Sequence, residues 1–168
     1  EVTVSFKIDI RDLSNYDGYK LDWYIGWFLD INFSRYSKIN EYINNSDDYI
    51  GSIGNSFYYY NGYLVIEIYA LTSLCDDFEN IVISTANGIS DDDRELFELV
   101  KKNSLTSLSV RKDSISNYVR PIEDNYITFD YAEVDDIDVI KNFSYDDYKK
   151  VINSIDFSYY SVFYRKKK

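Results

Sequence analysis

The sequence has no histidine, one cysteine and one proline among its 168 residues. Because imidazole is the commonest general base and metal ligand, residues of this chain cannot form a Ser-His-Asp triad, a zincin site or a facial-triad iron site. The single cysteine, Cys75, allows no internal disulfide and no thiolate zinc site, and we interpret it as a small buried hydrophobe. We therefore predict no catalytic residue, no metal ion and no cofactor.

Long hydrophobic runs and phosphate-binding loops are also missing. No window approaches the roughly 18 apolar residues that a membrane span requires. The glycines Gly51 and Gly54 are not followed by the Lys-Ser or Lys-Thr pair of a phosphate-binding loop. With one cysteine and no span, we expect a cytoplasmic protein, or a secreted one if a leader precedes Glu1.

Apolar patterning in the sequence is strong enough for a folded core, since 45% of the residues are hydrophobic and 18% are aromatic. Residues 2–10 alternate between apolar and polar side chains, which predicts a half-buried strand. Residues 21–33 also carry an apolar side chain at every second position. This predicts a long second strand that pairs antiparallel with the first and bends at Gly26.

The strongest local signal is the Asn61-Gly62 pair, which predicts a type I′ hairpin between residues 56–60 and 63–69. Ser90 and Ser144 are predicted to cap helices. The other predicted elements are helices over 36–43, 91–102 and from 145 onward, and strands over 80–86, 105–110, 126–131 and 157–164. Together they predict a single acidic α+β domain over residues 1–168, with a largely antiparallel, twisted sheet of about seven or eight strands and two or three helices packed on one face.

Charge of one sign dominates: 29 acidic residues outnumber 18 basic ones, for a net charge of -11. This charge opposes binding to phosphate backbones and anionic membranes, so we predict no direct nucleic-acid or membrane partner. The same field attracts cationic proteins and speeds their association. The predicted partner is therefore a basic protein, such as a toxin or a nuclease-like enzyme, and a homodimer through an exposed strand edge remains open.

Tyrosine is the other marked enrichment, with 19 copies. Neighbouring tyrosines in a strand face opposite sides, so some of them must be exposed, where they provide rigid contact area. Acidic pairs and clusters complete the candidate binding surface. The predicted partner-binding residues are Asp47, Asp48, Tyr58, Tyr60, Tyr63, Asp135, Asp136 and Asp138.

These features predict a protein-binding inhibitor of the immunity type that neutralises a basic toxin or nuclease. In general character the chain resembles bacterial toxin-immunity proteins, a likeness of composition that covers no defined segment. Two alternatives remain open. A viral or phage counter-defence or host-interaction protein that mimics nucleic-acid charge would need carboxylates spaced like phosphates. A carboxylate-dependent hydrolase would need a concave pocket that holds an acid of raised pKa.

Overall fold

The computed structural model describes residues 1–34, 37, 39, 50–72, 74–88, 93–111, 119, 123, 126–127 and 137–165. Within them the chain forms a four-stranded antiparallel sheet with the strand order β2-β3-β1-β4. The strands are β1 (Val2–Asp9), β2 (Ile50–Tyr60), β3 (Tyr63–Thr72) and β4 (Tyr160–Tyr164). The predicted α+β class is confirmed, whereas the predicted number of strands is too high for the described residues.

β2 and β3 form the hairpin that the Asn61-Gly62 pair predicts. Both turn residues have a positive φ, 48° for Asn61 and 82° for Gly62, as a type I′ turn requires. β1 pairs with β3 and alternates between buried and more accessible side chains, so the predicted first strand is also confirmed. Its even-numbered residues enter the core, and the odd-numbered ones point to the opposite face of the sheet.

Gly18–Phe33 forms the helix α1, so the predicted second strand is wrong. Asp17 caps the helix by accepting a hydrogen bond from the backbone amide of Lys20. The period-two pattern misled because α1 is buried on most of its circumference, and apolar side chains therefore occupy even as well as odd positions. The buried residues of α1 are Leu21, Tyr24, Ile25, Trp27, Phe28, Leu29, Ile31, Asn32 and Phe33.

A second predicted strand, over residues 80–86, is the end of the helix α3 (Cys75–Ala86). Its buried side chains, Phe78, Val82 and Ala86, recur every four residues, which is helical spacing. Cys75 opens this helix and packs against the core as a partly buried side chain, so its burial is less complete than predicted.

The helix α4 (Arg94–Arg111) starts within the predicted helix over 91–102 and continues through the predicted strand over 105–110, which is therefore wrong. The predicted helix over 36–43 lies almost wholly outside the described residues. So does most of the predicted strand over 126–131, of which Tyr126 and Ile127 are helical.

The C-terminal predictions hold. The helix α7 (Tyr145–Asn153) begins at Ser144, whose side chain accepts a hydrogen bond from the amide of Asp147 at 3.2 Å. It follows the short helix α6 (Ile137–Lys141). β4 confirms the final strand, although it begins at Tyr160 rather than at residue 157.

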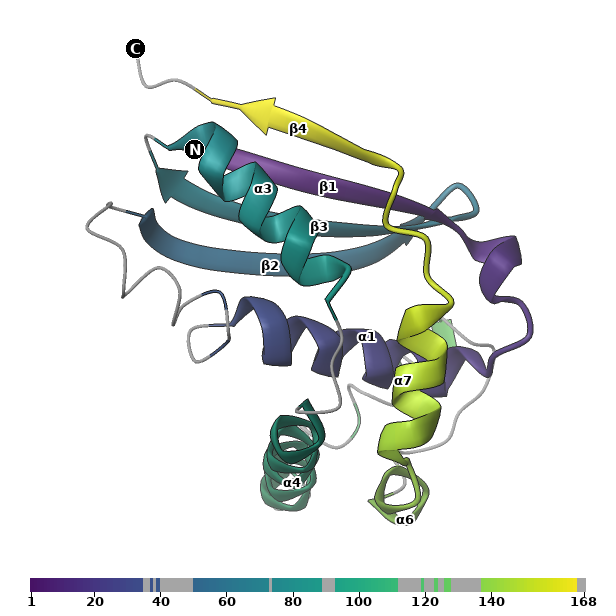
Figure 1. The fold of residues 1–168 in the computed structure, drawn as a ribbon. Coiled ribbons are helices and arrows are strands. Elements are labelled where there is room, and N and C mark those ends of the chain that lie inside the picture. Colours follow the sequence, from purple (N-terminus) through teal and green to yellow (C-terminus); the bar gives the residue numbers. More distant parts are fainter. Residues whose placement is uncertain are drawn as a thin grey trace.

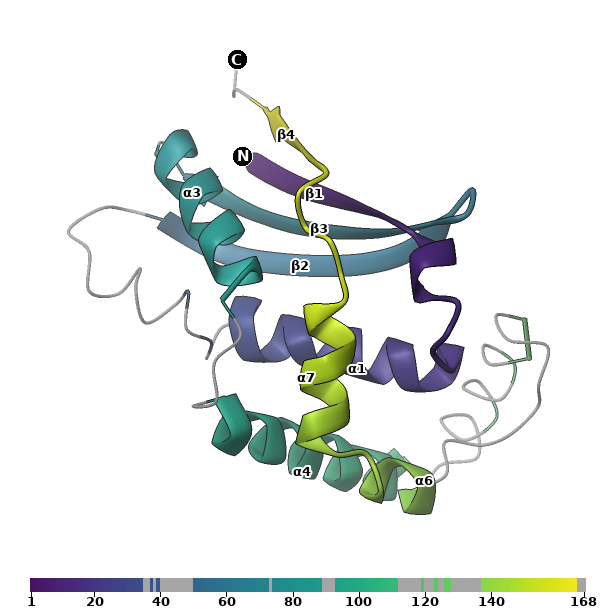
Figure 2. The ribbon, with the colours of Figure 1, turned by 45° about the vertical axis from the view of Figure 1, so that its right-hand side comes forward.

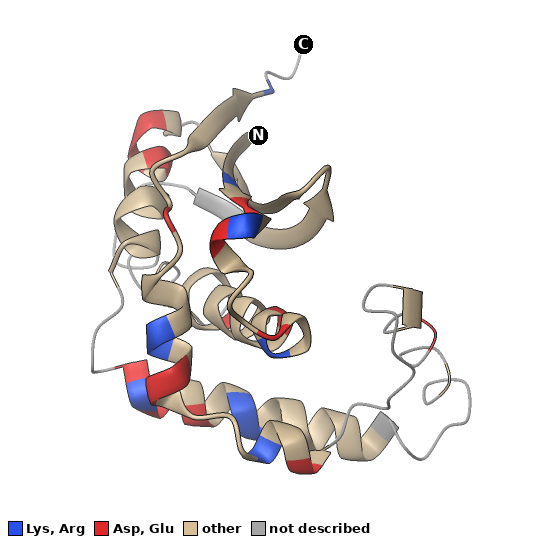
Figure 3. Cartoon of the chain, turned by 90° about the vertical axis from the view of Figure 1, so that its right-hand side faces the viewer, with Lys and Arg blue, Asp and Glu red and all other residues tan. Residues whose placement is uncertain are grey.

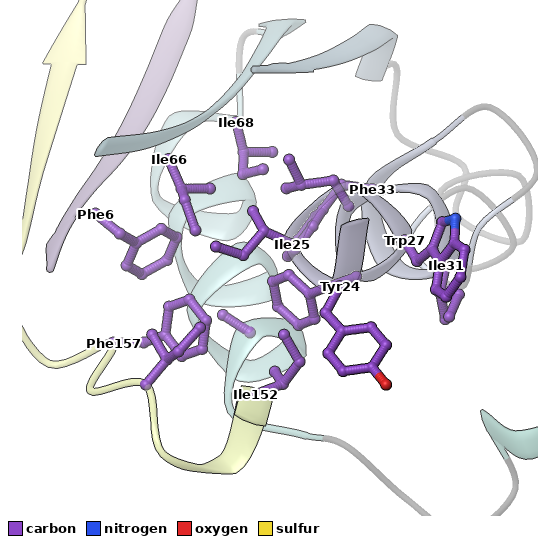
Figure 4. Packing of buried hydrophobic residues seen from close by; sticks show 14 of the residues in the cluster. Phe6, Tyr24, Ile25, Trp27, Ile31, Phe33, Ile66, Ile68, Ile152 and Phe157 are labelled. Carbon is purple, nitrogen blue, oxygen red and sulfur yellow. The ribbon is translucent and has the colours of Figure 1, made fainter. Parts of the chain in front are cut away.

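All labelled helices lie on one side of the sheet (Figures 1 and 2). α1 and α3 pack against the sheet, and α4 crosses below α1, farther from the strands. Figure 4 shows Phe6, Ile66 and Ile68 of the sheet pointing toward Ile25 of α1 and Phe157. The opposite face of the sheet carries no described helix. None of the helices in the described residues is both long and apolar enough to cross a membrane.

Candidate functional site

Two adjoining hollows, of about 360 and 310 Å³, lie where α1 crosses α4. They share Trp23, Asp30 and Ser104 among their lining residues, so we treat them as a single groove. We define the acidic groove by six of its residues, namely Asp22, Trp23, Gly26 and Asp30 of α1 with Leu96 and Leu99 of α4. In this groove two carboxylates lie beside apolar side chains.

The acidic wall of the groove follows from the helical repeat. Asp22, Gly26 and Asp30 are four residues apart and therefore lie on the same side of α1. Eight residues at a rise of 1.5 Å each separate the two aspartates by roughly 12 Å along the helix. A Cβ placed on Gly26 would meet no heavy atom within 4 Å, so a notch is open between the two acids.

Asp22 lies deeper in the groove than Asp30. Burial raises the pKa of the Asp22 carboxyl to about 6, although the hydroxyl of Tyr59 donates a hydrogen bond to its Oδ1 at 2.5 Å and opposes the shift. Burial also raises the pKa of Asp30, whose side chain reaches the rim. Among the described residues that line either hollow there is no lysine or arginine. The groove therefore presents two partly desolvated carboxylates without a basic side chain beside them.

Tryptophan side chains fix the geometry of the groove. The indole Nε1 of the buried Trp27 donates to Ser104 Oγ at 2.9 Å and ties α4 to α1. Trp23, which is partly exposed, packs against it with ring centroids 5.6 Å apart. The hydrogen bond from Trp27 to Ser104 therefore joins the two walls, and the ring contact holds Trp23 in place within the α1 wall.

A second candidate surface is the outer edge of β4, with which no described strand pairs. The amide of Lys7 donates to the carbonyl of Tyr159 at 3.0 Å. Hydrogen-bonded pairs alternate with non-hydrogen-bonded pairs in an antiparallel ladder, so every second residue from Tyr159 bonds to β1. The residues between them direct N–H and C=O groups to the outer edge; these are Tyr160, Val162 and Tyr164.

Aromatic side chains flank this edge. Their exposed fractions are 71% for Tyr159, 40% for Tyr160, 62% for Phe163 and 49% for Tyr164. Charged residues of both signs lie near this edge. The hydroxyl of Tyr164 donates to Glu79 of α3 at 3.1 Å, and Asp76 lies in the first turn of that helix. Lys7 pairs with Tyr159, and Arg165 follows Tyr164 directly. The edge therefore combines free backbone groups, exposed rings and, on the side of α3, carboxylates.

No family model matches the sequence, and no curated protein matches it. Solved structures with a similar fold do match the chain. The chain is similar to a putative M16-like peptidase from Alicyclobacillus acidocaldarius, with a TM-score of 0.73 and 14% identity over 96% of this chain and 39% of the other. It is also similar to the periplasmic protease PqqL from Escherichia coli, with a TM-score of 0.63 and 12% identity over 92% of this chain and 17% of the other.

The chain has the fold of part of an M16-like peptidase. It spans well under half the length of either protein. The predicted immunity-type inhibitor is wrong, because the structural neighbours of this chain are peptidases and nothing links it to immunity proteins. That prediction rested on net charge and tyrosine content, which describe a surface and do not specify a fold.

Three of the predicted partner-binding residues lie together. Tyr58, Tyr60 and Tyr63 share the uncovered face of the sheet at the hairpin, since Tyr60 pairs with Tyr63 and Tyr58 is two residues from Tyr60. Tyr60 is the most exposed of them at 64%, and the ammonium of Lys7 lies 3.8 Å from the ring centroid of Tyr63. Tyr58 and Tyr60 are therefore exposed and Tyr63 is partly buried, and their role in binding a partner stays a prediction.

The predicted acidic residues are not brought to the hairpin tyrosines. Asp138 lies in α6, on the far side of the helical layers, where it forms an ion pair with Lys141 at 2.8 Å. Asp47, Asp48, Asp135 and Asp136 lie outside the described residues. In Figure 3 the described acidic and basic positions lie mainly on the helices and few lie on the strands.

Sequence reasoning missed the two aspartates of the acidic groove because it treated residues 21–33 as a strand. In a strand, Asp22, Gly26 and Asp30 would line an outward face among other polar positions. Their spacing of four was the available signal, since four residues bring side chains together on a helix.

Proposed function

We propose that this chain is a non-catalytic, polypeptide-binding domain that receives an extended basic segment at the outer edge of β4. The observation that carries the proposal is the alternation of the β1–β4 ladder, which leaves the backbone groups of Tyr160, Val162 and Tyr164 facing outward. An extended polypeptide adds to such an edge as a further strand, with affinity supplied by main-chain hydrogen bonds.

The fold supports a polypeptide as the ligand. Both structural neighbours are described as peptidases or proteases, enzymes that act on polypeptide chains. Exposed aromatic rings beside the edge provide contact area for alternate side chains of an added strand.

The chemistry of the residues supports a role without catalysis. The chain has no histidine, so the zinc-peptidase motifs that place two histidines on one helix cannot occur in it. Among the described residues, no group of three or more Asp, Glu, Cys or His is placed to hold a metal ion. Asp22 and Asp30 lie roughly 12 Å apart along α1, too far to share one proton as a proteolytic carboxylate pair does.

Charge favours a basic ligand. The chain carries a net charge of -11, and Glu79 and Asp76 of α3 lie near Tyr164 of β4. A lysine-bearing segment is steered to such a surface and gains from it on binding, whereas an acidic segment is repelled.

Val162→Pro tests the proposal because it removes one outward N–H while leaving the hydrogen bonds to β1 in place. The probe is a fluorescein-labelled peptide of alternating lysine and threonine, and binding is followed by fluorescence anisotropy. We expect Val162→Pro to raise the dissociation constant about tenfold, which corresponds to the upper range for one lost hydrogen bond.

Val162→Ala is the matched control, since it loses side-chain packing but keeps the amide, and we expect it to bind as the unaltered protein does. Circular dichroism checks that both variants are folded.

Equal affinity of the proline and alanine variants would reject edge pairing. Equal affinity of the unaltered protein for a peptide of alternating glutamate and threonine would reject the basic ligand. Mass spectrometry of the recovered probe should show it intact; a cleaved peptide bond would reject the non-catalytic role.

A further inference from the structure

We propose that the acidic groove between α1 and α4 is a second, separate docking site, which binds an amphipathic α-helix carrying Lys or Arg at positions about two helical turns apart. This site is distinct from the edge of β4, because none of its described lining residues belongs to that strand. It uses different residues and a different form of ligand.

Charge complementarity identifies a cationic ligand. Asp22 and Asp30 lose part of their hydration in the groove, which is unfavourable for a charged group. No described lining residue is a lysine or arginine that could offset this loss with an ion pair. A basic side chain from a partner supplies the missing interaction on binding. Since the two carboxylates are roughly 12 Å apart along α1, the matching cations on a helical ligand lie seven or eight residues apart.

The apolar side chains of the groove require the ligand to carry hydrophobic residues as well. Leu99 is 53% exposed, and Leu96 and Trp23 are partly exposed beside it. Burying such side chains contributes about 25 cal/mol for each Å² removed from water. A ligand with apolar residues on one face and basic residues along its border satisfies both parts of the groove.

The backbone of the walls favours a helical ligand over an extended one. α1 and α4 satisfy their own main-chain groups through intrahelical hydrogen bonds, so they offer none to a neighbour. An extended peptide between them would bury unpaired N–H and C=O groups, which is costly. A helix satisfies its own backbone and binds through side chains alone.

Gly26 provides the sharpest test, because the notch between the two acids exists only while this residue has no side chain. Gly26→Leu fills the notch, and leucine also stabilises a helix interior by roughly 1 kcal/mol relative to glycine. Circular dichroism and urea denaturation check that this variant is folded, so that loss of binding is assigned to the filled notch. Gly26→Ala is the matched control, since it gains the same helical stability with far less bulk.

The probe is a synthetic 18-residue amphipathic helix of leucine, alanine and lysine, with a second version in which glutamate replaces lysine. Binding to the full chain is measured by the change in tryptophan fluorescence, since Trp23 lines the groove. We expect Gly26→Leu to weaken binding of the lysine helix at least about tenfold, a change typical of a blocked contact at an interface centre. Gly26→Ala should weaken it by less than about threefold.

Asp22→Asn and Asp30→Asn test the role of charge, and Asp77→Asn is the matched control because it removes an exposed carboxylate outside the groove. Combined, the two groove substitutions should weaken binding about tenfold, whereas the control should have little effect. Val162→Pro should leave this affinity unchanged, which separates the result from that for the β4 edge.

Three results would overturn the proposal. Equal binding of the lysine and glutamate helices would exclude charge recognition. Unchanged binding by Gly26→Leu would place the helix elsewhere. Self-association of the free chain that Gly26→Leu abolishes, measured by analytical ultracentrifugation, would assign the groove to a second copy of this chain.

Discussion

At the scale of single residues, Asp22 has a carboxyl group whose proton affinity depends on the fold. An aspartate in an unfolded chain has a pKa of about 3.9, whereas burial raises the pKa of Asp22 to about 6. Between these two values the folded protein holds more protons at this site than the unfolded chain does. Its contribution to stability is therefore greatest below about pH 4 and is lost as the pH rises through 6.

This imbalance predicts that Asp22→Asn stabilises the protein at neutral pH. The amide carries no charge to bury, and its oxygen still accepts the hydrogen bond from Tyr59. We expect the free energy of unfolding at pH 7.5 to rise by about 2 kcal/mol, and its slope between pH 4 and pH 6 to flatten. Urea denaturation at a series of pH values measures both quantities.

Tyr59→Phe provides the opposite perturbation, because it removes the hydrogen bond that lowers the pKa of Asp22. We expect this variant to be less stable at pH 7.5 and to regain part of its stability as the pH falls below 6. If Asp22→Asn keeps the pH slope of the unaltered protein, another group is responsible for that slope.

At the scale of elements, the two glycines Gly62 and Gly26 show what local sequence can and cannot specify. Gly62 was predictable because the Asn61-Gly62 pair determines the turn by itself, and the structure places both residues at positive φ. Gly26 was misinterpreted as a bend in a strand, because the choice between helix and strand for residues 21–33 depends on what surrounds them. With the sheet on one side and α4 on the other, the apolar residues around α1 fit both periods.

The same substitution should therefore have opposite effects in the two elements. Gly62→Ala places a Cβ at a φ of 82° and should lower the free energy of unfolding by about 1 kcal/mol. Gly26→Ala, in the interior of a helix and with open space around it, should raise it by about 0.5–1 kcal/mol. Urea denaturation of the two variants side by side measures the contrast.

Asn61→Gly is the control for the hairpin, because glycine tolerates a positive φ and should leave stability within a few tenths of a kcal/mol. A stabilising effect of Gly62→Ala would mean that the turn adopts another conformation in solution.

At the scale of the whole molecule, composition and function are only loosely connected. A net charge of -11 predicts attraction of basic ligands, but the fold follows from the pattern of buried residues. The solved structures with a similar fold are peptidases, so they contradict the inhibitor that the charge suggested. The candidate binding surfaces also depend on tertiary structure. The acidic groove needs α4 beside α1, and the outward backbone groups of β4 need its pairing with β1. Neither arrangement is visible in the sequence alone.

One aromatic side chain links the helical layers of the molecule. Phe97 of α4 is fully buried, with its ring centroid 5.3 Å from that of Trp27 in α1 and 5.1 Å from that of Tyr148 in α7. α1 is linked in turn to the sheet side of the core, since Phe28 stacks on Phe157 at 5.4 Å. Aromatic contacts therefore join α4 to one side of α1, and a second group of aromatic contacts joins the other side of α1 to Phe6 of the sheet through Phe157.

This arrangement predicts that the layers unfold together even when the link is weakened. Phe97→Ala should lower the free energy of unfolding by about 3–5 kcal/mol, whereas Phe163→Ala, at an exposed site on β4, should change it by less than about 0.5 kcal/mol. Tryptophan fluorescence reports on α1, and far-ultraviolet circular dichroism reports on all elements. We expect the two transitions of Phe97→Ala to coincide, because α1 packs on both the sheet and α4. If the fluorescence transition comes first, the α1–α4 layer unfolds independently, and the acidic groove opens without loss of the sheet.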